Sequence, residues 1–160
     1  MGLSTQGISS PRAMFTSIVV GTDGSDTATQ AVRQAIELAR SVGARIELVS
    51  AYEPVTDPRL HAETIHVPED LHWIINPRED VEATLEDAAR EVRAAGVEVE
   101  VFARQGDPAD AILDVAEERG SDLIIVGNKG MTGAKRFLLG SVPNKISHHA
   151  PCSVLIIRTV

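Results

Sequence analysis

Short apolar runs alternate along the chain with segments in which apolar residues recur every three or four positions. The runs are typical of strands and cover residues 17–20, 45–51, 97–101, 123–126 and 153–159. The periodic segments are typical of helices and cover residues 28–42, 81–95 and 108–116, and a short helix is expected over 141–149. This alternation predicts an α/β fold in which a parallel sheet carries helices on both faces.

Two of the predicted strands differ in pattern. Residues 123–126 are apolar throughout, which is typical of a strand buried on both faces, whereas 97–101 alternate strictly, which indicates a sheet edge. Capping residues mark the helix ends. Gly43 is expected to end the first helix, and Asp107 is expected to cap the third helix, with Pro108 as its first residue.

The length of 160 residues fits a single domain, which we place at residues 16–160. Residues 1–15 are small and polar without periodicity, so we expect a disordered tail; Met14 is an alternative start, which would leave most of this tail outside the native protein. Residues 52–77 contain four prolines and no clean period, and we expect a long loop that is either a functional lid or disordered. The sequence shows neither a secretory signal nor a membrane-spanning apolar run, so no membrane partner is expected.

Charge is distributed unevenly. The net charge of −8 argues against general nucleic-acid binding. From Leu123 to Val160, however, there are five basic residues and no Asp or Glu, which indicates a local anion site.

The single cysteine, Cys152, excludes an internal disulfide and fits a reducing cytoplasm; we expect it to be a small buried side chain.

The most informative segment leaves the buried strand at Gly127 and enters the last predicted helix at Ser141. Gly130 and Gly140 lie between them, in the spacing G-x2-G-x9-G-[ST]. Glycines let backbone N–H groups approach a ligand, and a helix start is a ready phosphate site. Lys129 adds positive potential. The alternative is that the glycines serve only turns and that Ser141 is only an N-cap. Neither a Walker A loop nor a G-x-G-x-x-G fingerprint is present.

The same spacing resembles the ATP-binding signature of the universal stress protein family. Residues 19–25 (VVGTDGS), 106–108 (GDP) and 151–157 (PCSVLII) are also similar to that family, so the resemblance covers residues 16–160. It implies a Rossmann-like fold of the adenine nucleotide alpha hydrolase type, with an open five-stranded parallel sheet of order 3-2-1-4-5. The nucleotide would cross the carboxyl ends of strands one and four, where the order reverses.

The resemblance implies a set of nucleotide-binding positions, to which Lys129 is added for its charge within the loop. Asp23 is expected to accept hydrogen bonds from ribose hydroxyls or to meet a metal; alternatively, Asp23 or Ser25 only caps the first helix. The backbone of Ala51 is expected to meet adenine. The complete set is Thr22, Asp23, Ala51, Gly127, Lys129, Gly130, Gly140, Ser141 and Val142.

The expected function is that of a cytoplasmic, ATP-binding universal stress protein that acts as a sensor or regulator, with Mg²⁺ as an accompanying ion. Alternatives are binding of cyclic AMP or another adenine nucleotide, slow ATP or adenylyl hydrolysis, and a protein-interaction module without nucleotide. We expect no catalytic residue, because no nucleophile is paired with a base. We also expect no protein metal site, because His61, His66 and His72 lack the spacing of metal ligands.

The last strand, residues 153–159, is apolar on both faces although the expected strand order places it at an edge. A long apolar edge promotes aggregation unless it is covered. Members of the family that this chain resembles commonly dimerise through this strand. We therefore expect a homodimer formed through residues 153–159.

Overall fold

The computed structural model describes residues 14–53, 78–128 and 139–158, and within them all the predicted strands and helices are present. Their order along the chain is β1 (Ser17–Gly21), α1 (Asp26–Val42), β2 (Arg45–Tyr52), α3 (Arg78–Ala94), β3 (Val99–Gln105), α4 (Pro108–Arg119), β4 (Leu123–Gly127), α5 (Ser141–His149) and β5 (Ser153–Ile157). The third strand begins two residues later than predicted, because Val97 is buried in the turn after α3.

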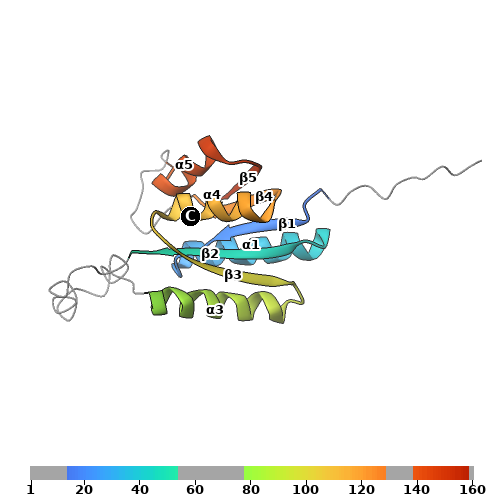
Figure 1. The fold of residues 1–160 in the computed structure, drawn as a ribbon. Helices are drawn as coiled ribbons and strands as arrows, with labels where there is room; N and C mark the ends of the chain where they lie inside the picture. The colour runs from blue at the N-terminus through green and yellow to red at the C-terminus, as the bar shows by residue number, and fades with distance from the viewer. Residues whose placement is uncertain (1–13, 54–77, 129–138, 159–160) are drawn as a thin grey trace, which may run out of the picture.

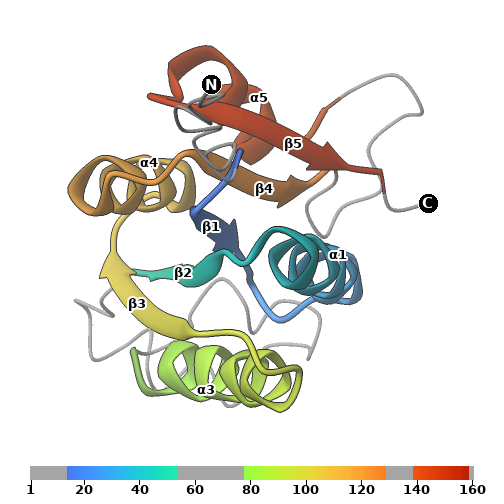
Figure 2. The same cartoon turned by 90° about the vertical axis from the view of Figure 1, so that its right-hand side faces the viewer.

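The five strands form one parallel sheet of order β3-β2-β1-β4-β5, which confirms the predicted fold class (Figure 1). In Figure 2, α1 and α3 lie on one side of the sheet and α4 and α5 on the other. β3 is an edge strand, as its alternating pattern predicted, and β5 forms the opposite edge.

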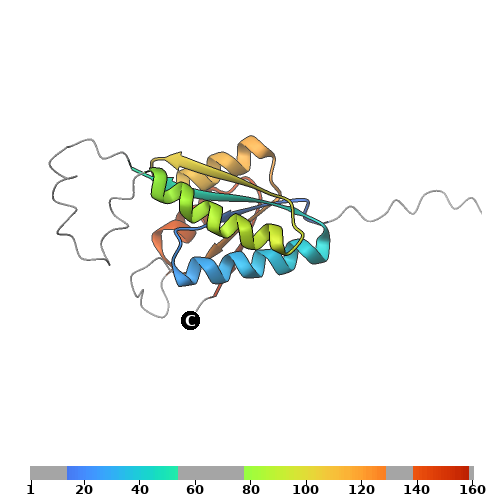
Figure 3. The same ribbon diagram turned by 90° about the horizontal axis from the view of Figure 1, so that it is seen from below.

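Each face of the sheet packs against its own pair of helices. Alternate strand residues such as Ile18 and Leu48 belong to a cluster with α1 and α3, which run side by side across that face (Figure 3). The intervening residues, such as Val19 and Val49, join a second cluster with α4 and α5. Both clusters consist of side chains that are almost fully buried, and burial of this kind stabilises the fold by about 1.5–3 kcal/mol for each large apolar side chain.

Local backbone chemistry sets the helix ends as predicted. Gly43 ends α1 in the left-handed conformation, with φ of 73°, where a residue with a Cβ would be strained. The Asp107 carboxylate accepts a hydrogen bond from the Asp110 N–H at 3.0 Å and caps α4, whose first residue is Pro108. These caps determine where α1 and α4 stop and start against the sheet.

A buried polar network closes the amino-terminal end of the sheet. The Glu47 side chain is buried, accepts a hydrogen bond from the Ser17 hydroxyl at 2.8 Å and pairs with Arg45 at 2.7 Å. The Asp122 carboxylate accepts backbone N–H groups of Thr16 and Ser17 at 2.9 to 3.1 Å. Burial opposes ionisation of Asp122, but these hydrogen bonds outweigh it and lower its pKa. The network therefore joins β1 to β2 and to the start of β4.

Several sequence predictions concern residues that the structure does not describe or that lie next to them. Residues 1–13 of the expected tail and 54–77 of the expected loop lie outside it, together with the three loop histidines. Phe15, which we assigned to the tail, is partly buried against the first core cluster. Cys152 is partly rather than fully buried, packs against the second cluster, and burial raises the pKa of its thiol. None of the helices described is long and apolar enough to cross a membrane.

Candidate functional site

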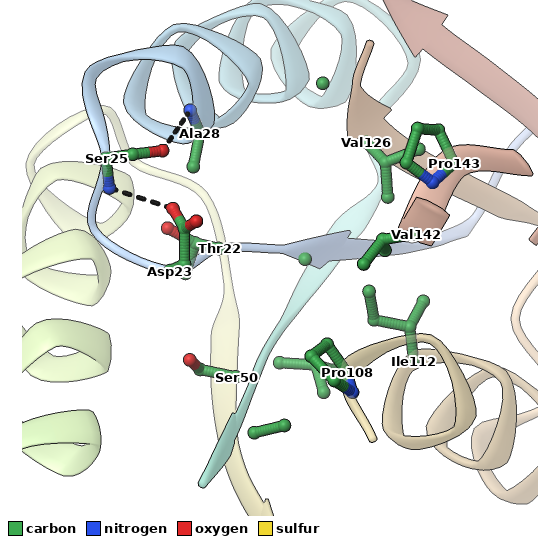
Figure 4. Close-up of a pocket in the computed structure, with 14 residues that line it drawn as sticks. Thr22, Asp23, Ser25, Ala28, Ser50, Pro108, Ile112, Val126, Val142 and Pro143 are labelled. Carbon is green, nitrogen blue, oxygen red and sulfur yellow. Dashed lines mark hydrogen bonds between the residues drawn. The ribbon is translucent and has the colours of Figure 1, made fainter. Parts of the chain in front are cut away.

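A pocket lies at the carboxyl end of the sheet, where β1, β2 and β4 end side by side. β2 lies on one side of β1, and β4 lies on its other side. The strand order therefore reverses at β1, and open α/β sheets commonly bind ligands at such a point. The pocket residues that the structure describes enclose a volume of about 140 Å³. Figure 4 shows polar groups of the β1–α1 loop on one side and the apolar side chains of Ile112, Val126 and Val142 on the other.

Most of the predicted nucleotide-binding residues that the structure describes lie at this pocket. Thr22, Asp23, Ala51, Gly127 and Val142 line it. Gly140 and Ser141 immediately precede Val142 at the start of α5. Lys129 and Gly130 lie outside the described residues. The structure thus brings together positions at the ends of the first, second and fourth strands and at the start of α5, which are up to 120 residues apart in the chain (Thr22 to Val142).

The loop between β1 and α1 is held by its own side chains. The Thr22 hydroxyl accepts the Gly24 N–H at 3.2 Å, and the Asp23 carboxylate accepts the Ser25 N–H at 2.9 Å through Oδ1. The Ser25 hydroxyl accepts the Ala28 N–H at 3.2 Å and is the N-cap of α1. The alternative that Asp23 caps α1 is therefore wrong. Asp23 is exposed and presents its carboxylate beside the pocket (Figure 4).

The backbone of Ala51 faces the pocket because β1 is shorter than β2. Pairing of these strands ends with Gly21 opposite Val49, and the Val49 C=O accepts the Thr22 N–H at 2.9 Å. Alternate residues of a strand direct their N–H and C=O groups to the same neighbouring strand, so Ala51 directs its groups as Val49 does. No backbone group of the described residues bonds to Ala51 from that side. One donor and one acceptor therefore face the space beyond the end of β1.

The start of α5 leaves backbone donors unpaired. Gly140, not Ser141, is the N-cap, and no side chain caps the helix, so the alternative reading of Ser141 as an N-cap is wrong. Pro143 has no N–H, and the Asn144 N–H donates to the Gly140 C=O at 3.1 Å. Among the described residues, the N–H groups of Ser141 and Val142 have no acceptor. Such groups, with the helix dipole, favour an anion at this point.

A salt bridge ties α5 to α4 beside the pocket. The Lys145 ammonium lies 3.3 Å from the Asp107 carboxylate and 2.8 Å from that of Asp110. Burial opposes ionisation of Asp107, but the Asp110 N–H and Lys145 outweigh it and lower its pKa, while the two carboxylates raise the pKa of Lys145. Asp107 thus caps α4 and also contacts, through Lys145, the helix that carries Ser141.

Sequence reasoning missed several pocket residues, among them Gly21, Ser50, Pro108 and Ile112. A Cβ on Gly21 would lie 2.4 Å from Ile112 Cδ1, so a side chain there requires the end of the Ile112 side chain to move. The sequence signal for Gly21 was a glycine at the end of an apolar run. Its contact with Ile112, however, depends on how α4 packs against the sheet, which the sequence pattern does not show. Within the described residues, no group of three or more His, Cys, Asp or Glu side chains is placed to hold a metal ion.

Comparison with known proteins gives consistent matches over nearly the whole chain. The universal stress protein family profile matches residues 14–158. Universal stress protein YxiE of Bacillus subtilis is 35% identical over 150 residues, covering 91% of this chain and all of YxiE. Rv1636 of Mycobacterium tuberculosis is 34% identical over 146 residues, covering 91% of this chain and 97% of Rv1636. A crystal structure of a universal stress protein in complex with cyclic AMP has a TM-score of 0.67 and 32% identity, covering 91% of this chain and 98% of that one.

Proposed function

Because this chain belongs to the universal stress protein family, we propose that it binds ATP in the pocket at the carboxyl end of the sheet and acts as a nucleotide-dependent stress sensor or regulator. The observation that carries the proposal is that two sets of free backbone groups lie at the same pocket. Ala51 supplies a donor and an acceptor, and the start of α5 supplies two donors.

The proposed base site lies at Ala51. The adenine edge that bears N6 and N1 presents a donor beside an acceptor, which complements the C=O and N–H of one residue. The apolar side chains of Ile112, Val126 and Val142 provide contact surface for a flat ring. The Asp23 carboxylate, with one oxygen bonded to the loop, has acceptor capacity left for ribose hydroxyls or for a Mg²⁺ that accompanies the phosphates.

The proposed phosphate site lies at Gly127, Gly140, Ser141 and Val142. The two unpaired N–H groups and the Ser141 hydroxyl donate to phosphate oxygens, and the absence of a Cβ on Gly140 permits close approach. Lys129 and Gly130 are proposed members of the same site from their place in the motif.

Isothermal titration of the purified protein with ATP, ADP, cyclic AMP and GTP tests the proposal. We expect ATP to bind and Gly140→Glu to abolish binding, because the new carboxylate would occupy and repel the phosphate position. Ser147→Glu is the matched control: it adds the same charge to an exposed position of the same helix, away from its start. If the folded wild-type protein bound none of these nucleotides, the proposal would be overturned.

Cyclic AMP is the second candidate ligand, favoured by the similarity to a universal stress protein that was crystallised with it. A single phosphate needs only the two donors at Ser141 and Val142. Competition of ATP against cyclic AMP in the same titration decides between them. Slow hydrolysis is a third candidate; phosphate or AMP release that Asp23→Ala abolishes would support it.

We also propose that two copies associate through β5, in the cytoplasm, where these nucleotides occur. β5 pairs with β4 along one side only, and Leu155 on it is 39% exposed. Pairing with a second β5 would cover this edge. Size-exclusion chromatography with light scattering should give a dimer at micromolar concentration, and Leu155→Lys should shift it to monomer.

A further inference from the structure

The outer edge of β3 carries a row of backbone groups that the sheet does not use. The Glu98 C=O accepts the Ile46 N–H at 2.9 Å. At the other end of the strand, the Gly106 N–H donates to the Tyr52 C=O at 2.9 Å. Because backbone groups alternate in direction along a strand, the even-numbered residues from 98 to 106 face β2 and the odd-numbered residues face outward. The outward-facing residues of β3 are Val99, Val101, Ala103 and Gln105.

Within the part of the chain that the structure describes, nothing pairs with this outer edge. β3 is the last strand of the sheet, and Figure 2 shows it between α3 on one face and α4 on the other. The strand has seven residues and no proline, and Val101 on it is 38% exposed. A strand edge of this kind can pair with another strand.

The side chains of β3 make the strand complementary to a second copy of itself. Phe102 packs against the cluster on the α4 face of the sheet, and Glu100 and Arg104 lie on the same face, two residues before it and two residues after it. Their charges are opposite and equally spaced about Phe102. If a second β3 runs antiparallel, with a two-fold axis at Phe102, each Glu100 therefore lies opposite an Arg104.

The same register also uses every outward backbone group. Val99 lies opposite Gln105 of the second copy, and Val101 lies opposite Ala103 of the second copy. All of these residues face outward, so each such pair exchanges two hydrogen bonds. Any other register leaves outward groups unpaired at the strand ends. Backbone pairing and charge pairing therefore favour one and the same arrangement.

Ion pairs within the chain already hold the charged side chains along this edge. Glu100 accepts a hydrogen bond from Arg119 at 2.7 Å, and Arg104 donates to Glu118 at 3.1 Å. The guanidinium groups of Arg104 and Arg119 lie over the Phe102 ring, 5.5 and 5.8 Å from its centre. Across the two-fold axis, these pairs would join into a row of alternating charge that runs from Arg119 and Glu100 of one copy to Arg104 and Glu118 of the other.

We propose that β3 is a self-association surface, at which it pairs antiparallel with β3 of a second copy in the register centred on Phe102. The proposal depends neither on the nucleotide site nor on association through β5. Because β3 and β5 are opposite edges of the sheet, both can be occupied in one chain, which would join dimers into larger assemblies. One pair of strands buries little surface, so we expect β3 to associate at higher concentration than β5.

Sedimentation of the Leu155→Lys chain, in which the proposed β5 association is blocked, tests the surface. This chain should dimerise between micromolar and submillimolar concentration. Glu100→Arg and Arg104→Glu should each weaken its dimerisation about 10-fold or more, because each interface contains the charge pair twice and attraction becomes repulsion. Glu37→Arg is the matched control: it makes the same charge change at an exposed position of α1, and it should leave dimerisation unchanged.

Mixing the two charge variants separates pairing from a general disturbance of the strand. The Glu100→Arg chain carries only positive charge at positions 100 and 104, and the Arg104→Glu chain carries only negative charge there. An equimolar mixture should therefore form a heterodimer more tightly than either variant dimerises alone. A loss of association that came from altered folding would not be restored by mixing.

Disulfide cross-linking tests the register. In chains whose Cys152 is replaced by serine, Glu100→Cys and Arg104→Cys place thiols at positions that lie opposite each other, within the Cα separation that a disulfide accepts. Oxidation with copper phenanthroline should cross-link a mixture of these two variants and neither variant alone.

Three results would overturn the proposal: a Leu155→Lys chain that stays monomeric at submillimolar concentration, charge variants that dimerise as tightly as their parent, or a mixture that gains nothing over its components. Cross-linking of the Glu100→Cys chain with itself would contradict the register centred on Phe102. If Glu100→Arg, and not Leu155→Lys, abolishes a micromolar dimer of the wild-type protein, β3 is the main interface and the proposed association through β5 is wrong.

Discussion

Gly21→Ala tests how the end of β1 and the helix α4 share the wall of the pocket. A methyl group on Gly21 would lie 2.4 Å from Ile112 Cδ1 and 3.2 Å from its Cγ1, whereas carbon atoms pack best at about 3.5–4.0 Å. The Ile112 side chain must therefore retreat by about 1 Å. Ile112 is 4% exposed and packed in the second core cluster, and the open space beside it is the pocket.

The expected cost is that of overpacking, about 1–3 kcal/mol in the free energy of unfolding. The φ of Gly21 is not positive, so alanine adds no backbone strain, and it recovers about 0.4–1 kcal/mol by restricting the unfolded chain. A net loss of about 1–2 kcal/mol should lower the urea midpoint by about 0.5–1 M, for a slope of about 2 kcal/mol/M. ATP affinity should fall in parallel, since the displaced Ile112 side chain enters the pocket.

Ile112→Val provides the decisive comparison, because it removes the Cδ1 atom that the new methyl group meets. Alone, this change should cost about 0.5–1.5 kcal/mol. Combined with Gly21→Ala, it should add little or even restore stability, which corresponds to a coupling of about 1–2 kcal/mol in a double-mutant cycle. Strictly additive losses, or a Gly21→Ala variant as stable as the wild type, would refute the reasoning.

The remaining predictions concern the polar networks. Glu47→Ala should lower the free energy of unfolding by about 2–4 kcal/mol in urea titration, because it removes a buried carboxylate from Ser17 and from Arg45. A loss below 1 kcal/mol would contradict this. Lys145→Met should leave the urea midpoint close to that of the wild type, because the side chain is 42% exposed and its ion pairs are screened by solvent. The pKa of Asp122 is lowered in the folded protein, so its contribution is present above the unfolded value near 4 and is lost as the pH falls through the folded pKa. Asp122→Asn should therefore make stability between about pH 5 and 2 less dependent on pH, and an unchanged acid limb would contradict the assignment.

The fold was predictable because every level of the sequence indicates the same arrangement. The fully apolar run at 123–126 became a central strand, the alternating segment after Gly96 became an edge, and Asp107 with Pro108 began a helix as expected. These features depend on neighbours in sequence or on the burial of whole segments, which periodicity reports directly.

The details of the site depend on distances between elements, and periodicity does not report these. The crowding of any side chain at Gly21 follows from the approach of Ile112, 91 residues later. The cap of α5 lies at Gly140, one residue earlier than the alternative reading placed it, because boundaries are the least certain part of a pattern.

The proposed site relies mainly on backbone groups, and this explains which residues are visible in the sequence. Ala51, Ser141 and Val142 contribute N–H or C=O groups that almost any residue could supply. Glycines are required where those groups must be approached, so the motif is recognised by its glycines and not by its donors. Discrimination between ligands then falls to the few side chains that reach the pocket with unused hydrogen-bonding capacity. In this chain the Asp23 carboxylate, beside the proposed ribose site, is such a group. Substitutions of Asp23 should therefore alter which nucleotide binds, whereas substitutions at the start of α5 should alter whether any nucleotide binds.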